Sequence, residues 1–265
     1  MINSIYLGDN LEFLKKFNSN LFDLVYIDPP FFSQKDYIDF NDKWNKLNDY
    51  LYFMKLRINE IYRVLKDTGS FYLHCDSSAG FELKILCDNI FNKKNFKREI
   101  IWNAGSVSGF KSKVKGWVRQ HDIILYYIKT KKFTFNKQYL PYKDKYIKVF
   151  RYKDENGRFY RKRPNGKKQY LDDKPGNMIG DVWNDIYSFQ TITRSNEYLK
   201  YPTQKPEKLL ERIIKSSSNE NDLIGDFFCG TGTTLKVAQN LNRNFIGIDI
   251  NPKVIELCKK RLNWI

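Results

Sequence analysis

The sequence predicts an α/β fold in which helices cover both faces of a mostly parallel, twisted sheet. Over residues 1–130 and 202–265, short apolar runs alternate with stripes of apolar residues at helical spacing. This alternation is typical of strands and their covering helices in a layered domain. A turn with two glycines at 229–232 joins one such run to a helix, as in folds that bind ligands at the carboxyl ends of parallel strands. Residues 131–201 break the rhythm, and we expect them to form an inserted region of strands and loops.

The first half of the chain supplies alternating strands and helices. Residues 21–27 form one apolar run and predict a buried strand. Apolar residues at steps of four and three then predict a long helix that begins near Leu47 and ends at Gly69. A strand starts at the next residue, a shorter helical stripe follows over 83–90, and residues 123–128 form a further strand.

The second half repeats this order. Pro206 suits the first position of a helix, where a missing N–H costs nothing. Apolar runs at 223–228 and 245–250 predict two strands with a helix between them. Pro252 opens the last helix.

The charge of the chain points to a polyanionic partner. In its 265 residues, 46 Lys and Arg oppose 30 Asp and Glu, a formal net charge of +16. Residues 129–174 alone carry sixteen Lys or Arg against five Asp or Glu, with Tyr and Phe interleaved. Scattered surface lysine is the simpler alternative, but it does not account for so concentrated a charge. Basic groups that bind phosphates beside aromatic rings are typical of nucleic-acid surfaces.

Several classes of protein are disfavoured. The four cysteines form no CxxC pair and there are two histidines, so we expect neither a metal site nor a disulfide framework. The first residues lack the basic and apolar pattern of a signal peptide, and no apolar run approaches the length of a membrane span. We expect a cytoplasmic protein without a membrane partner.

The segment 226–234, Asp-Phe-Phe-Cys-Gly-Thr-Gly-Thr-Thr, carries the first chemical motif. Gly230 and Gly232 let the backbone approach a ligand closely, and the helix that follows presents its amino terminus to a negative group. Asp249 ends the next strand, where a carboxylate can bind the hydroxyls of a ribose. Leu235 stands where a dinucleotide motif has its third glycine, which argues against NAD. A plain tight turn with a surface Asp is the alternative.

Asp28-Pro29-Pro30-Phe31 is the second motif and follows a predicted buried strand. A planar exocyclic amine could donate one N–H to Asp28 and the other to the Pro29 carbonyl. These bonds would localise the nitrogen lone pair for attack, while Phe31 stacks on the attached ring. An ordinary turn is the alternative for Asp-Pro-Pro alone.

Together the two motifs resemble the beta group of DNA amino-methyltransferases, which use S-adenosylmethionine to methylate adenine N6 or cytosine N4. The order of catalytic loop, basic region and cofactor loop is similar to that group. The resemblance extends to further segments: Gly8-Asp9, 72–76, 99–102, 121–125, 181–183 and 201–206. It implies a Rossmann-like methyltransferase fold with residues 131–201 as an inserted target-recognition region.

The resemblance also implies roles for individual residues. The catalytic loop is Asp28, Pro29, Pro30 and Phe31. The implied cofactor-binding residues are Asp9, Thr203, Gln204, Lys205, Asp226, Phe228, Cys229, Gly230, Gly232, Thr233 and Asp249. His74 and Asp76 resemble a position beneath the active-site floor, with buried packing as the alternative. Phe227 departs from the usual proline, which puts the rigidity of the loop in doubt more than the chemistry.

The implied activity is methylation of adenine N6 in double-stranded DNA, on a base extruded from the duplex. Asp at the head of the proline pair resembles the adenine enzymes, whereas cytosine N4 enzymes, the first alternative, more often have Ser. An RNA or protein substrate is a second alternative, and a catalytically silent DNA-binding subunit of a modification complex is a third. A homodimer and a separately encoded restriction endonuclease are the further partners that the resemblance implies.

Overall fold

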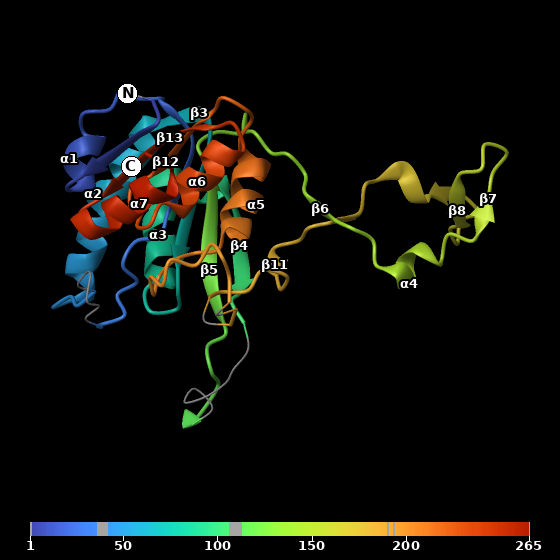
Figure 1. Cartoon of the computed structure of the whole chain (residues 1–265), viewed down its shortest axis with the longest axis horizontal. Coiled ribbons are helices and arrows are strands. Elements are labelled where there is room, and N and C mark those ends of the chain that lie inside the picture. The colour runs from blue at the N-terminus through green and yellow to red at the C-terminus, as the bar shows by residue number, and fades with distance from the viewer. Residues whose placement is uncertain (1, 36–41, 106–112, 190, 193, 265) are drawn as a thin grey trace. The chain divides into compact units, whose positions relative to one another are not determined.

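An eight-stranded sheet forms the centre of the larger of two compact units (Figure 1). The computed structural model describes residues 2–35, 42–105, 113–189, 191–192 and 194–264. The larger unit comprises residues 1–136 and 181–265, and the smaller unit comprises 137–180.

The sheet is mostly parallel, as predicted. Its strands lie in the order β1 (Ser4–Leu7), β13 (Asn244–Asp249), β12 (Leu223–Asp226), β2 (Phe22–Ile27), β3 (Leu65–Cys75), β5 (His121–Ile128), β4 (Phe96–Asn103) and β11 (Val182–Trp183). The first five are mutually parallel, β5 is antiparallel to both of its neighbours, and β11 is parallel to β4. The carboxyl ends of the five parallel strands therefore meet at one edge.

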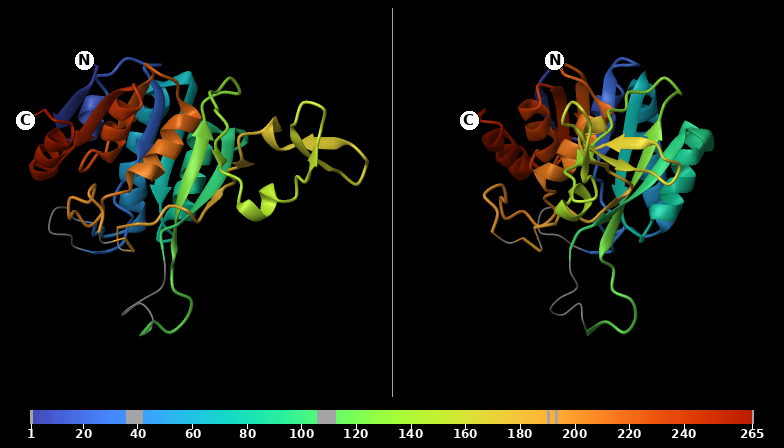
Figure 2. Two further views of the ribbon diagram at one scale, coloured as in Figure 1. Left: turned by 45° about the vertical axis from the view of Figure 1, so that its right-hand side comes forward. Right: turned by 90° about the vertical axis from the view of Figure 1, so that its right-hand side faces the viewer.

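Helices cover both faces of the sheet (Figure 2). The helices are α1 (Asn10–Leu14), α2 (Leu47–Val64), α3 (Gly80–Phe91), α5 (Glu207–Ser217), α6 (Thr233–Asn240) and α7 (Pro252–Arg261), with a short 3-10 turn at η1 (Lys93–Asn95). Helices α2 and α3 pack together on one face, and α5 and α6 pack together on the other. None of the helices in the described residues has an apolar stretch that could cross a membrane.

The apolar run of strand β3 is continuous because helices cover the strand on both faces. The Phe71 ring stacks on Phe91 of α3, with 5.2 Å between centroids and 6° between planes. The next side chain points to the opposite face, where the Tyr72 hydroxyl lies 2.7 Å from Ser217 Oγ of α5. Because side chains alternate across a strand, a strand covered on both faces needs apolar residues at successive positions.

Two predicted helix boundaries were wrong. Helix α2 ends at Val64 instead of Gly69, and β3 begins at Leu65. The chain before β2 causes this end, because the N–H groups of Asn20 and Leu21 donate to the Arg63 and Val64 carbonyls at 3.1 and 2.7 Å. Helix α5 begins one residue later than predicted, with Pro206 as its N-cap.

The smaller unit is built from short antiparallel pairs. Its elements are β6 (Tyr139–Leu140), α4 (Asp144–Ile147), β7 (Tyr152–Lys153), β8 (Phe159–Lys162), β9 (Lys168–Tyr170), η3 (Leu171–Asp173) and β10 (Asn177–Met178). Strands β7, β8 and β9 form one sheet, β6 pairs with β10, and Phe150 and Tyr160 are buried. The unit carries thirteen Lys or Arg against five Asp or Glu.

The smaller unit is shorter than the inserted region expected at 131–201. Residues 181–201 belong to the larger unit because β11 extends its sheet at the β4 edge. Trp183 of β11 is buried there, and the Arg212 guanidinium lies 5.0 Å from its ring centroid.

Candidate active site

A cavity of about 1670 Å³ lies at the carboxyl edge of the parallel strands. Fourteen of the fifteen predicted site residues line it: Asp9, Asp28, Pro29, Pro30, Phe31, Thr203, Gln204, Lys205, Asp226, Phe228, Cys229, Gly230, Thr233 and Asp249. Gly232 does not line it. The fold therefore brings segments from both ends of the sequence to one site.

Four neighbouring strands each bring a carboxylate to this cavity. Asp249 and Asp226 are the last residues of β13 and β12, Asp28 follows β2 directly, and Asp9 follows β1 by two residues. Because the strands are parallel and adjacent, these side chains share one edge. The site thus gathers four carboxylates, two of which, Asp9 and Asp28, form ion pairs with Arg57 and Lys205.

Asp226 is the most deeply placed of the four carboxylates. Its oxygens accept hydrogen bonds from Thr234 Oγ1 at 2.5 Å and from the Phe228 N–H at 3.1 Å. Burial raises the pKa of Asp226 to about 7, and the negative charges of Asp28 and Asp249 add to the effect. Burial also raises the pKa of Asp249, against the opposing hydrogen bonds of backbone N–H groups.

The two glycines of the turn do different work. Gly230 has φ +50°, its N–H donates to Asp249 Oδ2 at 2.9 Å, and a Cβ added to it would meet nothing within 4 Å. Gly232 has φ +76°, and a Cβ there would lie 2.2 Å from Cys258 Sγ of α7. Gly230 thus leaves open space, whereas Gly232 permits the turn to pack against α7.

The Phe227 ring anchors the turn in the core. It is fully buried and meets Phe22 edge to face, with 5.3 Å between centroids and 85° between planes. A second contact joins it to Phe17 at 6.5 Å. Its carbonyl accepts a hydrogen bond from Asn10 Nδ2 at 2.5 Å. Side-chain packing therefore holds the backbone at the position where a proline was expected.

Asp9 is held by residues outside the predicted set. Its Oδ1 caps α1 by accepting from the Leu11 N–H at 2.8 Å, and it also accepts from Arg57 Nη2 at 2.7 Å. Arg57 is buried, donates through Nε to Asn10 Oδ1 at 2.6 Å, and lies 3.4 Å above the centroid of the Phe53 ring. These contacts fix the carboxylate at the rim of the cavity.

Asp28 has one paired and one unpaired oxygen. Lys205 Nζ lies 2.5 Å from Asp28 Oδ2. The other oxygen, Oδ1, is buried and has no hydrogen-bond partner among the described residues, and it lies 3.9 Å from His74 Nδ1. An unsatisfied buried acceptor is costly, and a donor from a ligand can satisfy it.

Beneath this carboxylate, His74 forms the floor. The Phe31 ring stacks on the imidazole, with 5.7 Å between centroids and 29° between planes. His74 Nδ1 lies 2.8 Å from the Tyr26 hydroxyl, and Nε2 lies 3.4 Å from Asp122 Oδ2. Burial favours the neutral form of Asp122, but the hydrogen bond with His74 and the charge of Lys205 outweigh it, so the pKa of Asp122 is lowered.

Asp76, the second residue expected near the floor, is buried and forms an ion pair with Arg119. Its Oδ1 accepts from the Ser78 N–H at 2.7 Å. Arg119 Nη2 also lies 3.7 Å from Asp122 Oδ1. Asp76 therefore fixes the chain at the end of β3 and joins the charged groups around His74.

Gln204 and Lys205 of the segment 203–205 make different kinds of contact. The Gln204 side chain is used within the protein, where Oε1 accepts from the Leu199 N–H at 2.8 Å and Nε2 donates to the Glu197 carbonyl at 2.6 Å. The Lys205 carbonyl accepts from Thr233 Oγ1 at 3.1 Å, which joins this segment to the start of α6. Lys205 is then free to extend its ammonium to Asp28.

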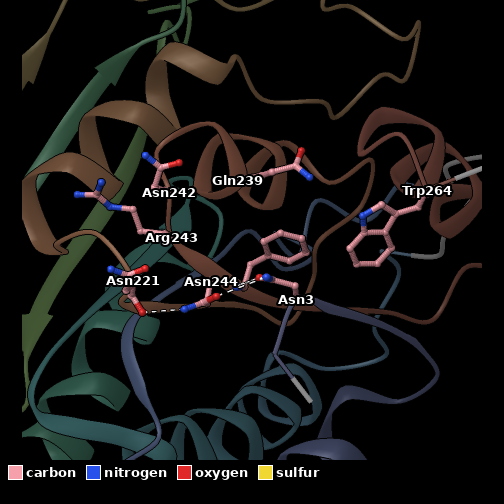
Figure 3. A pocket seen from close by; sticks show the side chains of 8 residues that line it. Asn3, Asn221, Gln239, Asn242, Arg243, Asn244 and Trp264 are labelled. Carbon is pink, nitrogen blue, oxygen red and sulfur yellow. Dashed lines mark hydrogen bonds between the residues drawn. The ribbon is translucent and has the colours of Figure 1, made fainter.

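A second, smaller cavity lies at the opposite edge of the sheet (Figure 3). Its amides bond to one another and to the backbone: Asn244 Nδ2 donates to the Asn221 carbonyl at 2.8 Å, and Asn3 Nδ2 lies 3.4 Å from Asn244 Oδ1. The Phe245 ring stacks on Trp264, with 5.7 Å between centroids. These groups fill the amino ends of the strands with contacts to one another, whereas the predicted site residues line the cavity at the carboxyl ends.

Comparison with known proteins agrees with this geometry. The family described as DNA methylase matches residues 22–260. The chain belongs to this family. In this DNA methylase, the matched segment includes the Asp28–Phe31 loop, the smaller unit and the glycine turn.

Two relatives match this methylase over almost its whole length. It is 35% identical over 256 residues to the type II methyltransferase M.HpaI of Haemophilus parainfluenzae, covering 96% of this chain and 72% of that protein. It is 34% identical over 263 residues to the DNA adenine methyltransferase YhdJ of Escherichia coli K12, covering 98% and 82%. The crystal structure of the M1.HpyAVI–SAM complex matches with a TM-score of 0.63 at 22% identity, covering 98% of each chain.

Sequence reasoning missed part of the methylase site. The cavity is also lined by residues outside the predicted set, among them Asn10, Tyr26, Asp42, Phe53, Arg57 and Asp122. Arg57 carried a usable signal, because a basic residue interrupts the otherwise apolar stripe of its helix. No sequence signal marked Asp42, because its carboxylate binds N–H groups that are nine to eleven residues away in the sequence.

Proposed function

We propose that this DNA methylase transfers a methyl group from S-adenosylmethionine to the N6 amine of an adenine extruded from double-stranded DNA. The observation that carries the proposal is Asp28 Oδ1, which is buried and has no hydrogen-bond partner in the described part of the chain, beside a Phe31 ring that lines the same cavity. An exocyclic amine supplies the donor that this oxygen lacks. The aromatic base attached to it supplies a face for Phe31.

The donor set of the cavity fits S-adenosylmethionine. This molecule carries a sulfonium and an ammonium, and four carboxylates surround the cavity that would receive them. Burial raises the pKa of Asp226 and of Asp249, and for Asp226 the negative charges of Asp28 and Asp249 add to the effect, so a cationic ligand would be favoured beside them. Asp249, which accepts from the Gly230 N–H, would hold the ribose, and Asp9, which follows the adjacent strand β1 by two residues, would meet the adenine. When bound, the cofactor supplies an electrophilic methyl group.

Asp28 has the central part in the chemistry. Its Oδ1 accepts an N–H from the target amine, and the Pro29 carbonyl accepts the second, which draws the nitrogen away from planarity. Lys205 holds Oδ2 through an ion pair, so Oδ1 remains available to the amine. Bound S-adenosylmethionine would supply the methyl group and be left as a neutral thioether. The nitrogen becomes acidic only as its new bond forms, so its proton would leave late, to Asp28 Oδ1, and Asp28 need not be a strong base.

Adenine is the proposed base, and cytosine N4 is the alternative. Asp28 at the head of the proline pair resembles the adenine enzymes, and the Escherichia coli relative is named an adenine methyltransferase. The silent-subunit alternative depended on Phe227 alone. The burial of its ring in the core supports an intact turn and an active enzyme.

The smaller unit is the proposed target-recognition region. Its thirteen basic residues provide contacts to phosphates. Within it, the Arg158 guanidinium lies 4.1 Å from the Tyr170 centroid and forms an ion pair of 2.7 Å with Asp172. A base inside a duplex cannot present its amine to a buried carboxylate, so the proposal requires extrusion of the target.

The test is incubation of the purified protein with tritiated S-adenosylmethionine and unmethylated duplex DNA, followed by nucleoside analysis. We expect label in N6-methyladenine. Label in N4-methylcytosine would retain the reaction and overturn the choice of base. Bound cofactor without label in any nucleoside would overturn the proposed activity, and a matched incubation with RNA would then test the other nucleic acid.

A further inference from the structure

The backbone that carries Phe31 is held by a carboxylate from another part of the loop. Asp42 is 1% exposed, and its oxygens accept from three successive N–H groups. Phe31 donates to Oδ2 at 3.2 Å, Phe32 donates to Oδ1 at 2.9 Å, and Ser33 donates to Oδ2 at 2.8 Å. Successive N–H groups that converge in this way form an anion-binding concavity of the backbone.

The concavity requires an unusual backbone conformation. Phe32 has φ +63° and Gln34 has φ +58°, in the left-handed region that side chains other than glycine rarely adopt. Such a conformation persists only where its surroundings enforce it. A buried negative charge that binds all three N–H groups provides that enforcement, because charge-assisted hydrogen bonds are stronger than neutral ones.

Further contacts hold the two sides of this loop together. The Tyr50 hydroxyl donates to the Pro30 carbonyl at 2.8 Å, directly before the residues that Asp42 binds. The Gln34 side chain bonds to both backbone groups of Trp44, at 3.2 Å to its N–H and 3.3 Å to its carbonyl. The Phe32 ring lies 5.6 Å from that of Tyr50. These contacts of Tyr50 and Gln34 do not involve the Asp42 carboxylate, so they would still hold the loop if the carboxylate were removed.

We propose that Asp42 is a positioning residue that orients Phe31 for stacking on the extruded base. It does not contact the amine. By fixing the Phe31 N–H it sets the backbone from which the ring projects against His74, beside the unpartnered oxygen of Asp28. This inference rests on the proposed function, because it assigns the partner of the Phe31 ring.

The first measurement compares Asp42→Ala with the wild type by steady-state methylation of duplex DNA. We expect kcat to fall about 100-fold, as for a misplaced positioning group, while the Kd for S-adenosylmethionine changes less than about twofold. Asp42→Asn keeps one acceptor oxygen for the Phe31 and Ser33 N–H groups, and we expect it to recover part of kcat. A wild-type kcat in Asp42→Ala would overturn the inference.

A double-mutant cycle then distinguishes positioning from general loss of structure. If Asp42 acts through Phe31, Asp42→Ala costs less than about threefold when Phe31→Ala is already present. Multiplicative losses in the double variant would overturn the inference. Asp222→Ala is the matched control, since Asp222 also accepts a loop N–H, that of Asn219 at 2.7 Å, at the opposite edge of the sheet. We expect this control to keep the wild-type kcat.

The two proposals fail in different ways. A wild-type protein that labels no nucleoside would overturn the proposed function and, with it, the positioning role that rests on it. A wild-type protein that methylates DNA while Asp42→Ala and Asp42→Asn do so equally well would remove only the positioning role. Thermal unfolding of each variant, measured alongside, separates an unfolded Asp42→Ala from a folded and inactive one, and Asp42→Asn then serves as the informative variant.

Discussion

Lys205 and Asp28 form an ion pair of 2.5 Å across a separation of 177 residues. The pair joins the loop before α5 to the loop after β2, so the two halves of the site meet through a salt bridge within the cavity. It leaves one carboxylate oxygen unpartnered among the described residues. A buried pair of this kind orients groups more reliably than it stabilises the fold, because its desolvation offsets much of the attraction.

The first prediction concerns Asp28. We expect Asp28→Ala to abolish methyl transfer while cofactor binding survives, because the variant removes the acceptor for the target amine and leaves Asp9, Asp226 and Asp249 in place. Tritium transfer to DNA and calorimetric titration with S-adenosylmethionine measure the two quantities separately. Normal turnover by Asp28→Ala would exclude the mechanism, and a joint loss of turnover and binding would place Asp28 in the cofactor site instead.

The two glycines of the turn provide a second prediction. Gly232→Ala places a Cβ 2.2 Å from Cys258 Sγ, so we expect a loss of folding stability that Tm will report. Gly230→Ala meets no atom within 4 Å, and its φ of +50° costs about 1–2 kcal/mol. We therefore expect Gly230→Ala to remain folded and to weaken cofactor binding, because its methyl group fills open space in the cavity. Equal effects of the two variants on Tm and on binding would contradict this division.

Asp226 provides a prediction about pH. Its pKa is about 7 in the folded protein and near 3.8 when exposed, so the folded state binds more protons between these values. Stability consequently falls as the pH rises from about 4 to 7, and the slope disappears above 7 because both states are then ionised. Asp226→Asn cannot ionise. We expect its stability relative to the wild type to increase over this interval, by up to a few kcal/mol at about 1.4 kcal/mol per pH unit.

Urea unfolding at several pH values, without cofactor, measures this difference. Asp222, Asp249 and Glu197 also have raised pKa values and contribute to the slope of both proteins, so the comparison is between wild type and variant. Parallel curves from pH 4 to 7 would show that Asp226 does not titrate in this range.

Phe227 provides the fourth prediction. Phe227→Ala removes a fully buried ring from contact with Phe22 and Phe17, which costs about 3–5 kcal/mol in comparable cores. We expect a lower Tm together with weaker cofactor binding, because the ring holds the backbone of the turn. Phe227→Leu fills part of the space and serves as the milder control. A variant that loses stability but binds the cofactor normally would show that the turn is rigid without the ring.

The sequence predicted the mostly parallel sheet, and most of the site residues that it suggested line one cavity, because both depend on local patterns. Strands β12 and β13 end in Asp226 and Asp249, Asp28 follows β2 directly, and parallel pairing brings these three positions together. The carboxylates at the ends of these strands could therefore be located without coordinates.

What the sequence could not predict depends on contacts between distant segments. The end of α2 is set by N–H groups from residues 20 and 21, which its own apolar stripe does not reveal. The separate tasks of Gly230 and Gly232 depend on Cys258, a residue of another helix. The Gln204 side chain matches a binding motif and yet bonds to the backbone of residues 197 and 199.

The pairing of β6 with β10 affects how the sequence of the smaller unit can evolve. Tyr139 and Leu140 lie opposite Met178 and Asn177, and the Ile179 N–H donates to the Gln138 carbonyl at 3.0 Å, so the chain enters and leaves the smaller unit through one two-stranded stalk. Neighbouring strands lie about 4.8 Å apart. We expect that the segment between these two strands, residues 141–176, can be lengthened, shortened or replaced without moving the strands of the eight-stranded sheet. Residues 137–180, the proposed target-recognition region, line no part of the cavity, so their sequence can diverge without changing the residues that do.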